Sequence, residues 1–408
     1  MCKELYKWKL SKELRSTEIY TDAGEEEGNS VLTSEEDILE RHKKAFMQEQ
    51  GYQKFVPKLP YAYLTVKCHK DPIGSRFIVG VAADQRARSD GEELSIVEKL
   101  HFATTNSTEC STTAASVWLD NELKKVMTLL EAKDRKLMAE QGISRYWIIE
   151  DMESFFQDIK IKDAMGQLRG KKPRTTDFTT MYTSLKQVDI VNNVETAVEE
   201  ALNFNARCSD RDHIQDIATK AKIMKHVKFI VQNTYIGNDP TYIVRQTRGL
   251  PMGTNCAPRL ANLTLYVYEA KYIDRLLHQG KIEDARLHTN TKRFIDDMIS
   301  FGTEPPGSEW YAGLEHKETT KTTCVEFLGA KIEWKPNGYL DFWVFDKLDE
   351  WNFSVIKFPH ADSNVAEHQS PGIVTGQLNR FRNIINSVKA FKEATTKLVI
   401  QMLRTPHH

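Results

Sequence analysis

Apolar residues recur at a helical spacing over several long stretches of the chain. Between residues 112 and 140 they fall about every 3.6 positions, which predicts one long helix. The same spacing predicts further helical segments over residues 188–202, over 212–231, over a long apolar stretch that ends at Leu276, and in a basic segment from Gly372 onwards. Helices are therefore expected in the middle and at the end of the chain.

Shorter apolar runs, bounded by turn-forming residues, predict β-strands, several of them paired as hairpins. The expected strands cover residues 58–67 and 76–81, a short run that ends at Asp177, 242–246, the two flanks of 293–301, and 325–334 with 339–345. Hairpins and long helices follow one another without an internal repeat. The pattern indicates a mixed fold of helices and sheets.

Composition narrows the class of protein. The chain has 408 residues, of which 40% are hydrophobic and 28% charged, as in ordinary globular proteins. This length suits roughly two or three domains, or one fold with several subdomains. The formal net charge of −1 argues against a protein that coats nucleic acid by bulk charge, although a local basic groove is compatible with it.

The six cysteines are scattered, and no Cys-x-x-Cys pair is present. This arrangement argues against a zinc ribbon or a disulfide framework and suits a reducing compartment. The N-terminus lacks the apolar stretch of a signal peptide, and no apolar run approaches the roughly 20 residues of a membrane span. We therefore expect an intracellular protein with no membrane partner.

Two adjacent carboxylates, Asp296 and Asp297, stand out between the apolar flanks of a predicted hairpin. They repel each other, and the apolar flanks raise the cost of removing their charges from water. A divalent cation such as Mg²⁺ would offset both effects. The alternative is a solvated acidic hairpin tip, because Asp is a common turn residue.

Two further elements favour the metal site. Asp177 ends a predicted strand 119 residues before Asp296 (296 − 177), so it can supply a third carboxylate if the two strands are neighbours. The loop Gly249-Leu-Pro-Met-Gly253 precedes a long helix, and its glycines permit a close backbone approach to a ligand. The alternative for this loop is an ordinary strand-to-helix connection.

In this order and spacing the motifs resemble those of reverse transcriptases. The matching blocks are Asp177 with Tyr182 five residues later, the Gly-Leu-Pro-Met-Gly loop, Phe-Ile-Asp-Asp, and Val-Glu-Phe-Leu-Gly329. The segment Lys67-Cys-His-Lys70 and the C-terminal Phe358-Pro-His are similar to the Penelope-like retroelements, the branch near telomerase. The resemblance runs from about residue 57 to residue 403.

The resemblance implies an α+β right-hand polymerase with fingers, a palm built on an antiparallel sheet, and a small helical thumb. The corresponding segments are an acidic N-terminal leader over residues 1–50, fingers over 51–165, a palm over 166–345, and a basic helical thumb-like segment over 346–408. No nuclease signature is visible in the sequence.

The resemblance also implies roles for individual residues. Asp177, Asp296 and Asp297 would be the catalytic ligands of Mg²⁺, with Mn²⁺ as a substitute, and Lys321 would protonate the departing pyrophosphate, with Lys317 nearly as plausible. The residues expected to bind the nucleotide are Lys67, Lys70, Arg76, Tyr182, Gly249, Pro251, Met252 and Gly253. Those expected to bind nucleic acid are Arg380, Arg382, Lys389 and Lys392.

The implied function is RNA-directed DNA synthesis by a retroelement enzyme that uses an RNA template, a DNA primer and dNTPs, with the nucleus as the favoured compartment. The Tyr182 ring would exclude a 2′-hydroxyl, which disfavours the alternative of an RNA-dependent RNA polymerase. A decayed or domesticated element that only binds RNA or a hybrid is the other alternative. Met252 departs from the pattern, since retroviral enzymes carry Gln at that position.

Overall fold

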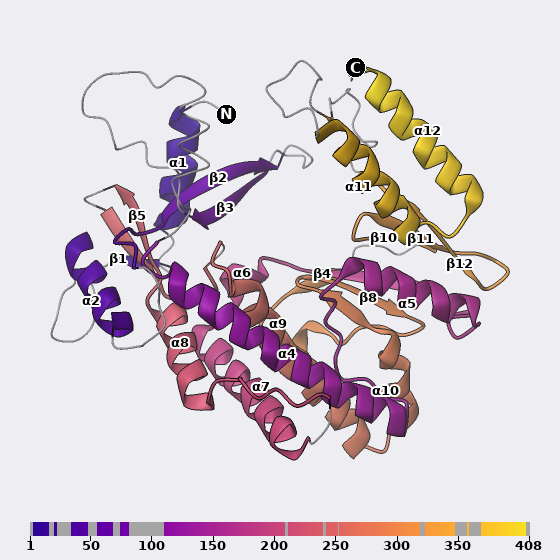
Figure 1. Ribbon diagram of the computed structural model, residues 1–408, viewed down its shortest axis with the longest axis horizontal. Helices are drawn as coiled ribbons and strands as arrows, with labels where there is room; N and C mark the ends of the chain where they lie inside the picture. The colour runs from indigo at the N-terminus through magenta and orange to yellow at the C-terminus, as the bar shows by residue number, and fades with distance from the viewer. Residues whose placement is uncertain are drawn as a thin grey trace. The chain divides into compact units, whose positions relative to one another are not determined.

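The computed structural model describes residues 3–15, 20–22, 34–47, 55–67, 74–80, 110–208, 211–239, 242–251, 253–318, 323–346, 357–358 and 369–404. Figure 1 shows the helices and strands of the chain, which divides into two compact units. Unit 1 contains Met1–Lys136 and Thr180–Tyr268, and unit 2 contains Leu137–Thr179 and Glu269–His408. Neither unit is continuous in sequence. The four segments expected from the sequence (leader, fingers, palm and thumb) are defined by function. The two structural units do not test that division, so it stays a prediction.

Unit 1 is built on one sheet and a set of helices. The sheet order is β1 (Tyr20–Asp22), β6 (Tyr242–Gln246), β5 (Tyr235–Asp239), β2 (Tyr61–Lys67) and β3 (Gly74–Gly80). All neighbours are antiparallel except β2 and β5. Among the described residues, the helices that begin in this unit are α1 (Lys3–Leu14), α2 (Glu35–Met47), α4 (Thr113–Gln141), α6 (Met181–Ser184), α7 (Gln187–Arg207), α8 (Lys220–Gln232) and α9 (Ala257–His278).

Most predicted elements of unit 1 are confirmed. The hairpin β2–β3 and the helices α4, α7 and α9 lie close to their expected bounds. The predicted helix 212–231 begins only at Lys220, because the Asn205 side chain exchanges two 2.8 Å hydrogen bonds with the backbone of Ile214 and holds the preceding segment as a loop. Thr219 then caps α8 by accepting a hydrogen bond from the backbone of Lys222. Strand β5 was not predicted.

Unit 2 contains two antiparallel sheets. The first has the order β7 (Lys292–Phe294), β8 (Asp297–Phe301), β4 (Pro173–Phe178) and β9 (His316–Glu318), and the second has the order β10 (Cys324–Phe327), β11 (Ala330–Trp334) and β12 (Leu340–Val344). The helices are α5 (Met152–Ala164), α10 (Ile282–Leu287), α11 (Gln369–Ile384) and α12 (Val388–Arg404), with short 3₁₀ turns at His288–Asn290 and Ser308–Trp310.

One core joins the two sheets of unit 2 to α5, α11 and α12. Its buried side chains include Phe156, Ile299, Phe301, Ile332, Phe342 and Leu398. The alternation of buried and exposed positions along β10 and β11 places the Val, Phe and Ile side chains on this core. This packing holds the four-stranded sheet, which contains Asp177 on β4, against the core.

The prediction of a single strand over residues 325–334 is wrong, because the chain reverses direction in the middle of that segment and forms two strands, β10 and β11. Leu328 and Gly329 both have positive φ, 48° and 73°, and form a two-residue hairpin turn between β10 and β11. Leu rarely adopts this backbone conformation, so the sequence gives no sign of the turn. The predicted hairpin that follows is confirmed as β11–β12.

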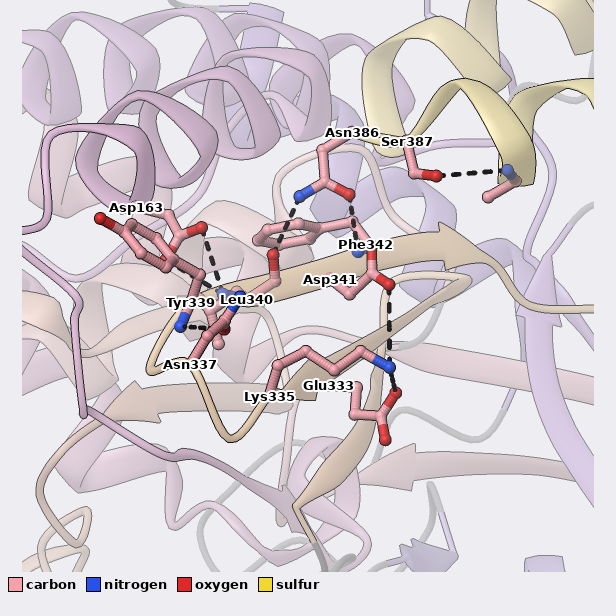
Figure 2. Close-up of polar contacts among 11 residues, drawn as sticks. Asp163, Glu333, Lys335, Asn337, Tyr339, Leu340, Asp341, Phe342, Asn386 and Ser387 are labelled. Atoms are coloured by element: carbon pink, nitrogen blue, oxygen red, sulfur yellow. Dashed lines mark hydrogen bonds and ion pairs between the residues drawn. The ribbon is translucent and has the colours of Figure 1, made fainter.

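Within the described residues, side chains rather than another strand cover the outer edge of β12 (Figure 2). Asn386, between α11 and α12, donates to the carbonyl of Leu340 (2.9 Å) and accepts from the N–H of Phe342 (3.0 Å). The Asp163 carboxylate accepts from the N–H of Leu340, at 3.1 and 3.2 Å, and burial raises its pKa. Covering an edge in this way prevents unwanted strand pairing.

Within the described residues, no helix combines the length and the hydropathy that a membrane span would need.

Candidate active site

Asp177 and Asp297 lie directly opposite each other on the neighbouring strands β4 and β8. Opposed residues of an antiparallel pair share one face of the sheet, with Cβ atoms about 4.5–5.5 Å apart. Like charges at such positions are destabilising unless something neutralises them. Asp177 is partly buried and Asp297 is exposed. The fold thus brings together two carboxylates that are 120 residues apart in sequence (297 − 177).

Asp296 lies in the turn that connects β7 to β8. Phe294 pairs with Asp297, so Ile295 and Asp296 form a two-residue turn. Ile295 has φ 57°, which is strained for a β-branched residue. The carbonyl of Asp296 accepts a 3.1 Å hydrogen bond from the N–H of Phe178, which follows Asp177. The backbone of the turn is therefore tied to the strand that carries Asp177.

Lys317 occupies the position opposite Asp177 on the other neighbouring strand, β9. The register therefore forms a row of Asp297, Asp177 and Lys317 across three strands on one face of the sheet. Lys317 is exposed. Lys321, the residue first expected to act as a proton donor, lies outside the described residues.

The carboxylates that could hold a metal at this end of the sheet are the opposed pair Asp177 and Asp297. In the described part of the chain, no group of three or more His, Cys, Asp or Glu side chains is placed to hold a metal ion, so Asp177, Asp296 and Asp297 do not converge as the three-carboxylate site expected from the sequence. Mg²⁺ commonly binds through one or two carboxylates and completes its octahedron with water and phosphate oxygens. The pair Asp177–Asp297, with Asp296 in the adjoining turn, fits that requirement, and Mn²⁺ accepts the same oxygen donors.

The glycine loop of unit 1 is docked on the turn that carries Tyr182. The N–H of Leu250 donates to the carbonyl of Tyr182, and the N–H of Gly249 donates to the carbonyl of Leu185, both at 2.7 Å. Gly249 has φ 82°, and a Cβ atom there would lie 2.2 Å from the Tyr182 carbonyl oxygen. Only glycine allows this approach. The structure therefore brings together two motifs that the sequence assigned to nucleotide binding.

The rest of this loop is described in part. Pro251 is buried and its carbonyl accepts from the Thr254 hydroxyl at 3.1 Å, whereas Gly253 is exposed with φ 112°. Met252 lies outside the described residues. The loop leads directly into α9, as expected.

Two of the basic residues expected in the fingers, Lys67 and Arg76, belong to the hairpin β2–β3. In its register Lys67 pairs with Gly74, and Arg76 pairs with Thr65. The side chains of Lys67 and Arg76, and the whole of Lys70, lie outside the described part of the chain. Their expected role therefore stays a prediction.

The C-terminal basic residues divide into two groups. Arg380 donates from Nη2 to the carbonyls of Gly329 (3.1 Å) and Phe345 (3.4 Å), so it holds the β10–β11 turn. Arg382, Lys389 and Lys392 are exposed on α11 and α12. An exposed side chain can reach a phosphate, whereas Arg380 already has partners within the protein.

Sequence reasoning missed a buried ion pair beside the turn that carries Asp296 and Asp297. Arg293, three residues before Asp296, pairs with Glu269 of α9, and both side chains are completely buried. A possible signal was Glu269 itself, a single acidic residue in the apolar run Leu265-Tyr-Val-Tyr-Glu269. Such a residue inside a core requires a partner.

Comparison with known proteins supports the fold alone. No protein-family model matches the chain, and neither does any curated protein. Among solved structures, telomerase from Candida albicans in complex with a TWJ fragment of telomeric RNA has a TM-score of 0.50 at 11% identity, over 99% of this chain and 60% of that chain.

Two further structures are less similar. Apo telomerase from Candida tropicalis has a TM-score of 0.48 at 11% identity, over 97% of this chain and 62% of that one. The Sicinivirus 3Dpol RNA dependent RNA polymerase has a TM-score of 0.36 at 9% identity, over 62% and 50%. The chain spans 50% to 62% of the lengths of these three neighbours. In its fold this chain is similar to the Candida albicans telomerase structure.

Proposed function

We propose that the chain is an RNA-directed DNA polymerase of a retroelement similar to the Penelope-like branch, and that it extends a primer 3′-hydroxyl with dNTPs. The observation that carries the proposal is the register of β4 and β8, which sets Asp177 opposite Asp297 next to a strained turn. The similarity in fold to a telomerase supports it. The right-hand division into fingers, palm and thumb belongs to the same proposal.

The carboxylates would hold the metal ions of a nucleotidyl transfer. Bound Mg²⁺ would lower the pKa of the primer hydroxyl and offset the charge on the leaving pyrophosphate. Asp177 and Asp297 would bind from the strands, and Asp296 from the turn. Lys317, on the same face, or Lys321 would donate a proton to the departing pyrophosphate.

Other residues would position the nucleotide. Lys67, Lys70 and Arg76 would bind the triphosphate, since charge-assisted hydrogen bonds suit phosphate oxygens. The Tyr182 ring, whose backbone is fixed by the loop at Gly249, would lie against the sugar and exclude a 2′-hydroxyl.

The partners would be an RNA template and a DNA primer, and the compartment would be the nucleus. Exposed Arg382, Lys389 and Lys392 would contact the phosphates of the hybrid, while Arg380 would hold the β10–β11 turn. Binding through phosphates makes the affinity fall steeply with salt.

Primer extension on poly(rA)–oligo(dT), with dTTP or UTP as the substrate, tests the proposal. We expect extension with dTTP and Mg²⁺ and little with UTP. Equal use of both nucleotides would indicate an RNA polymerase instead. Hybrid binding without any extension, in Mg²⁺ or Mn²⁺, would indicate a protein that only binds nucleic acid.

A further inference from the structure

The buried pair of Glu269 and Arg293 is connected to the turn that carries Asp296 and Asp297. Arg293 donates from Nε to Glu269 Oε1 at 2.5 Å and from Nη2 to Glu269 Oε2 at 3.2 Å. Both side chains have 0% exposure. The third guanidinium nitrogen of Arg293, Nη1, donates to the carbonyl of Ile295 at 2.9 Å. The guanidinium therefore joins α9 to the residue that immediately precedes the two carboxylates.

The backbone of Arg293 is held as firmly as its side chain. Its N–H donates to the carbonyl of Trp147 at 2.6 Å, and its carbonyl accepts from the N–H of Ile149 at 2.7 Å. Arg293 thus lies between β8, where it is opposite Met298, and the segment 147–149, to which both of its backbone groups are hydrogen-bonded. A residue fixed in this way can impose a position on the atom that its side chain binds.

The turn is in a conformation that needs such support. Ile295 has φ 57°, and a strained backbone persists only where the surrounding structure over-determines it. A second support comes from the strand side, where the N–H of Phe178 donates to Asp296 and the Phe178 ring packs edge-on against Tyr311 at 4.8 Å. Burial raises the pKa of Tyr311, so its phenol stays neutral beside the ion pair.

Stability alone is a weak reason for a buried ion pair at this place. Two well-packed apolar side chains of similar volume are often at least as stabilising, because the desolvation of two charges offsets their attraction. What an apolar pair cannot supply is a planar fork of donors that binds a carboxylate and a carbonyl at once. The geometry of Arg293 uses that property.

We propose that Arg293, oriented by Glu269, is a positioning residue: it fixes the Ile295 carbonyl and thereby holds the turn that contains Asp296 and keeps Asp297 opposite Asp177. The effect on catalysis rests on the proposed polymerase function. The effect on the turn does not, because it follows from hydrogen bonds within the protein.

The test compares the wild type with the double variant Arg293→Met/Glu269→Met. Replacing both partners avoids an uncompensated buried charge, so the melting temperature should stay near that of the wild type. The turn loses its donor, so the N–H of Phe178 should exchange with deuterium about tenfold faster. In primer extension kcat should fall about tenfold or more, because misplaced catalytic groups are costly, while KM for dTTP stays about the same.

The ion pair Arg145–Asp274 provides the matched control. In this pair, Arg145 Nη2 lies 3.1 Å from Asp274 Oδ2 within unit 2, and the carbonyls of Ile295 and Asp296 bind Arg293 and Phe178 instead. Arg145→Met/Asp274→Met should leave both the exchange at Phe178 and kcat unchanged. A change in these two quantities as large as that in the Arg293 double variant would overturn the proposal.

A second variant tests whether Arg293 positions the turn if the double variant does not fold. Arg293→Lys keeps the charge beside Glu269 but has one ammonium group in place of a fork, so exchange at Phe178 should again be faster. Wild-type exchange and wild-type kcat in a folded variant of either kind would overturn the proposal. If the wild type itself extends no primer, the exchange measurement still decides the role of Arg293, and the failure falls on the polymerase function.

Discussion

Replacing Gly249 by Ala should destabilise unit 1 far more than a glycine substitution usually does. An added Cβ would lie 2.2 Å from the carbonyl oxygen of Tyr182 and 2.8 Å from the Cα of Thr183. Both are backbone atoms, so no side chain can rotate away. The loop would have to withdraw by about 1 Å to reach ordinary contact, which begins at 3.4 Å.

The magnitude follows from two costs. A non-glycine residue at φ 82° costs about 1–2 kcal/mol. The withdrawal would also break two 2.7 Å hydrogen bonds, from Gly249 to Leu185 and from Leu250 to Tyr182, each worth about 1 kcal/mol net. The free energy of unfolding should therefore fall by about 3–4 kcal/mol.

Gly280→Ala is the matched control, because Gly280 has φ 71° and nothing within 4 Å of the added Cβ. It carries the backbone cost alone, about 1–2 kcal/mol. Urea denaturation followed by circular dichroism measures both variants. If Gly249→Ala destabilises the protein no more than Gly280→Ala, the close approach of the loop to the Tyr182 turn is refuted.

Three other variants test separate parts of the account. Tyr182→Ala should admit UTP and lower the ratio of kcat/KM for dTTP over UTP, with an unchanged melting temperature; an unchanged ratio would exclude the sugar gate. Burial lowers the pKa of His288 to about 4 from 6.5, so the wild type should lose stability, on the order of 3 kcal/mol, as the pH falls from 6.5 to 4. The His288→Phe variant should not show this loss of stability between pH 6.5 and pH 4. If its stability depends on pH as that of the wild type does, His288 is not the group responsible. Asn386→Ala removes two hydrogen bonds to the edge of β12 and should lower the free energy of unfolding by about 2 kcal/mol, measured by urea denaturation. An unchanged free energy of unfolding would mean that water replaces both hydrogen bonds.

The sequence predicted the elements that local patterns specify. The helical spacing in residues 112–140 and the turn-bounded runs around Asp296 and Asp297 lead directly to α4 and to the hairpin β7–β8. Residue chemistry also singled out Asp177, and the structure places it on the strand next to that hairpin. These features depend on spacing and composition, which the sequence displays.

Features that depend on tertiary contacts were not predictable in the same way. The turn at Leu328 and Gly329 requires a Leu with positive φ, which no local preference favours. The pairing of Glu269 with Arg293 joins residues on different elements, and the sequence of neither segment indicates which residue is its partner. The register that makes Asp297 the residue opposite Asp177 likewise emerges only from the assembled sheet.

The most direct test of the central claim is primer extension by Asp177→Asn and Asp297→Asn, with Asp158→Asn on the exposed side of α5 as the control. Removing one of two opposed charges should leave the protein as stable as the wild type or more so, since like charges across a strand pair are unfavourable. Both variants should nevertheless lose extension of poly(rA)–oligo(dT) by about 10³-fold, because a lost metal ligand removes several kcal/mol of transition-state stabilisation. Hybrid binding and the control should be unaffected. Extension at the wild-type rate by either variant would contradict the assignment of this carboxylate pair as the catalytic centre.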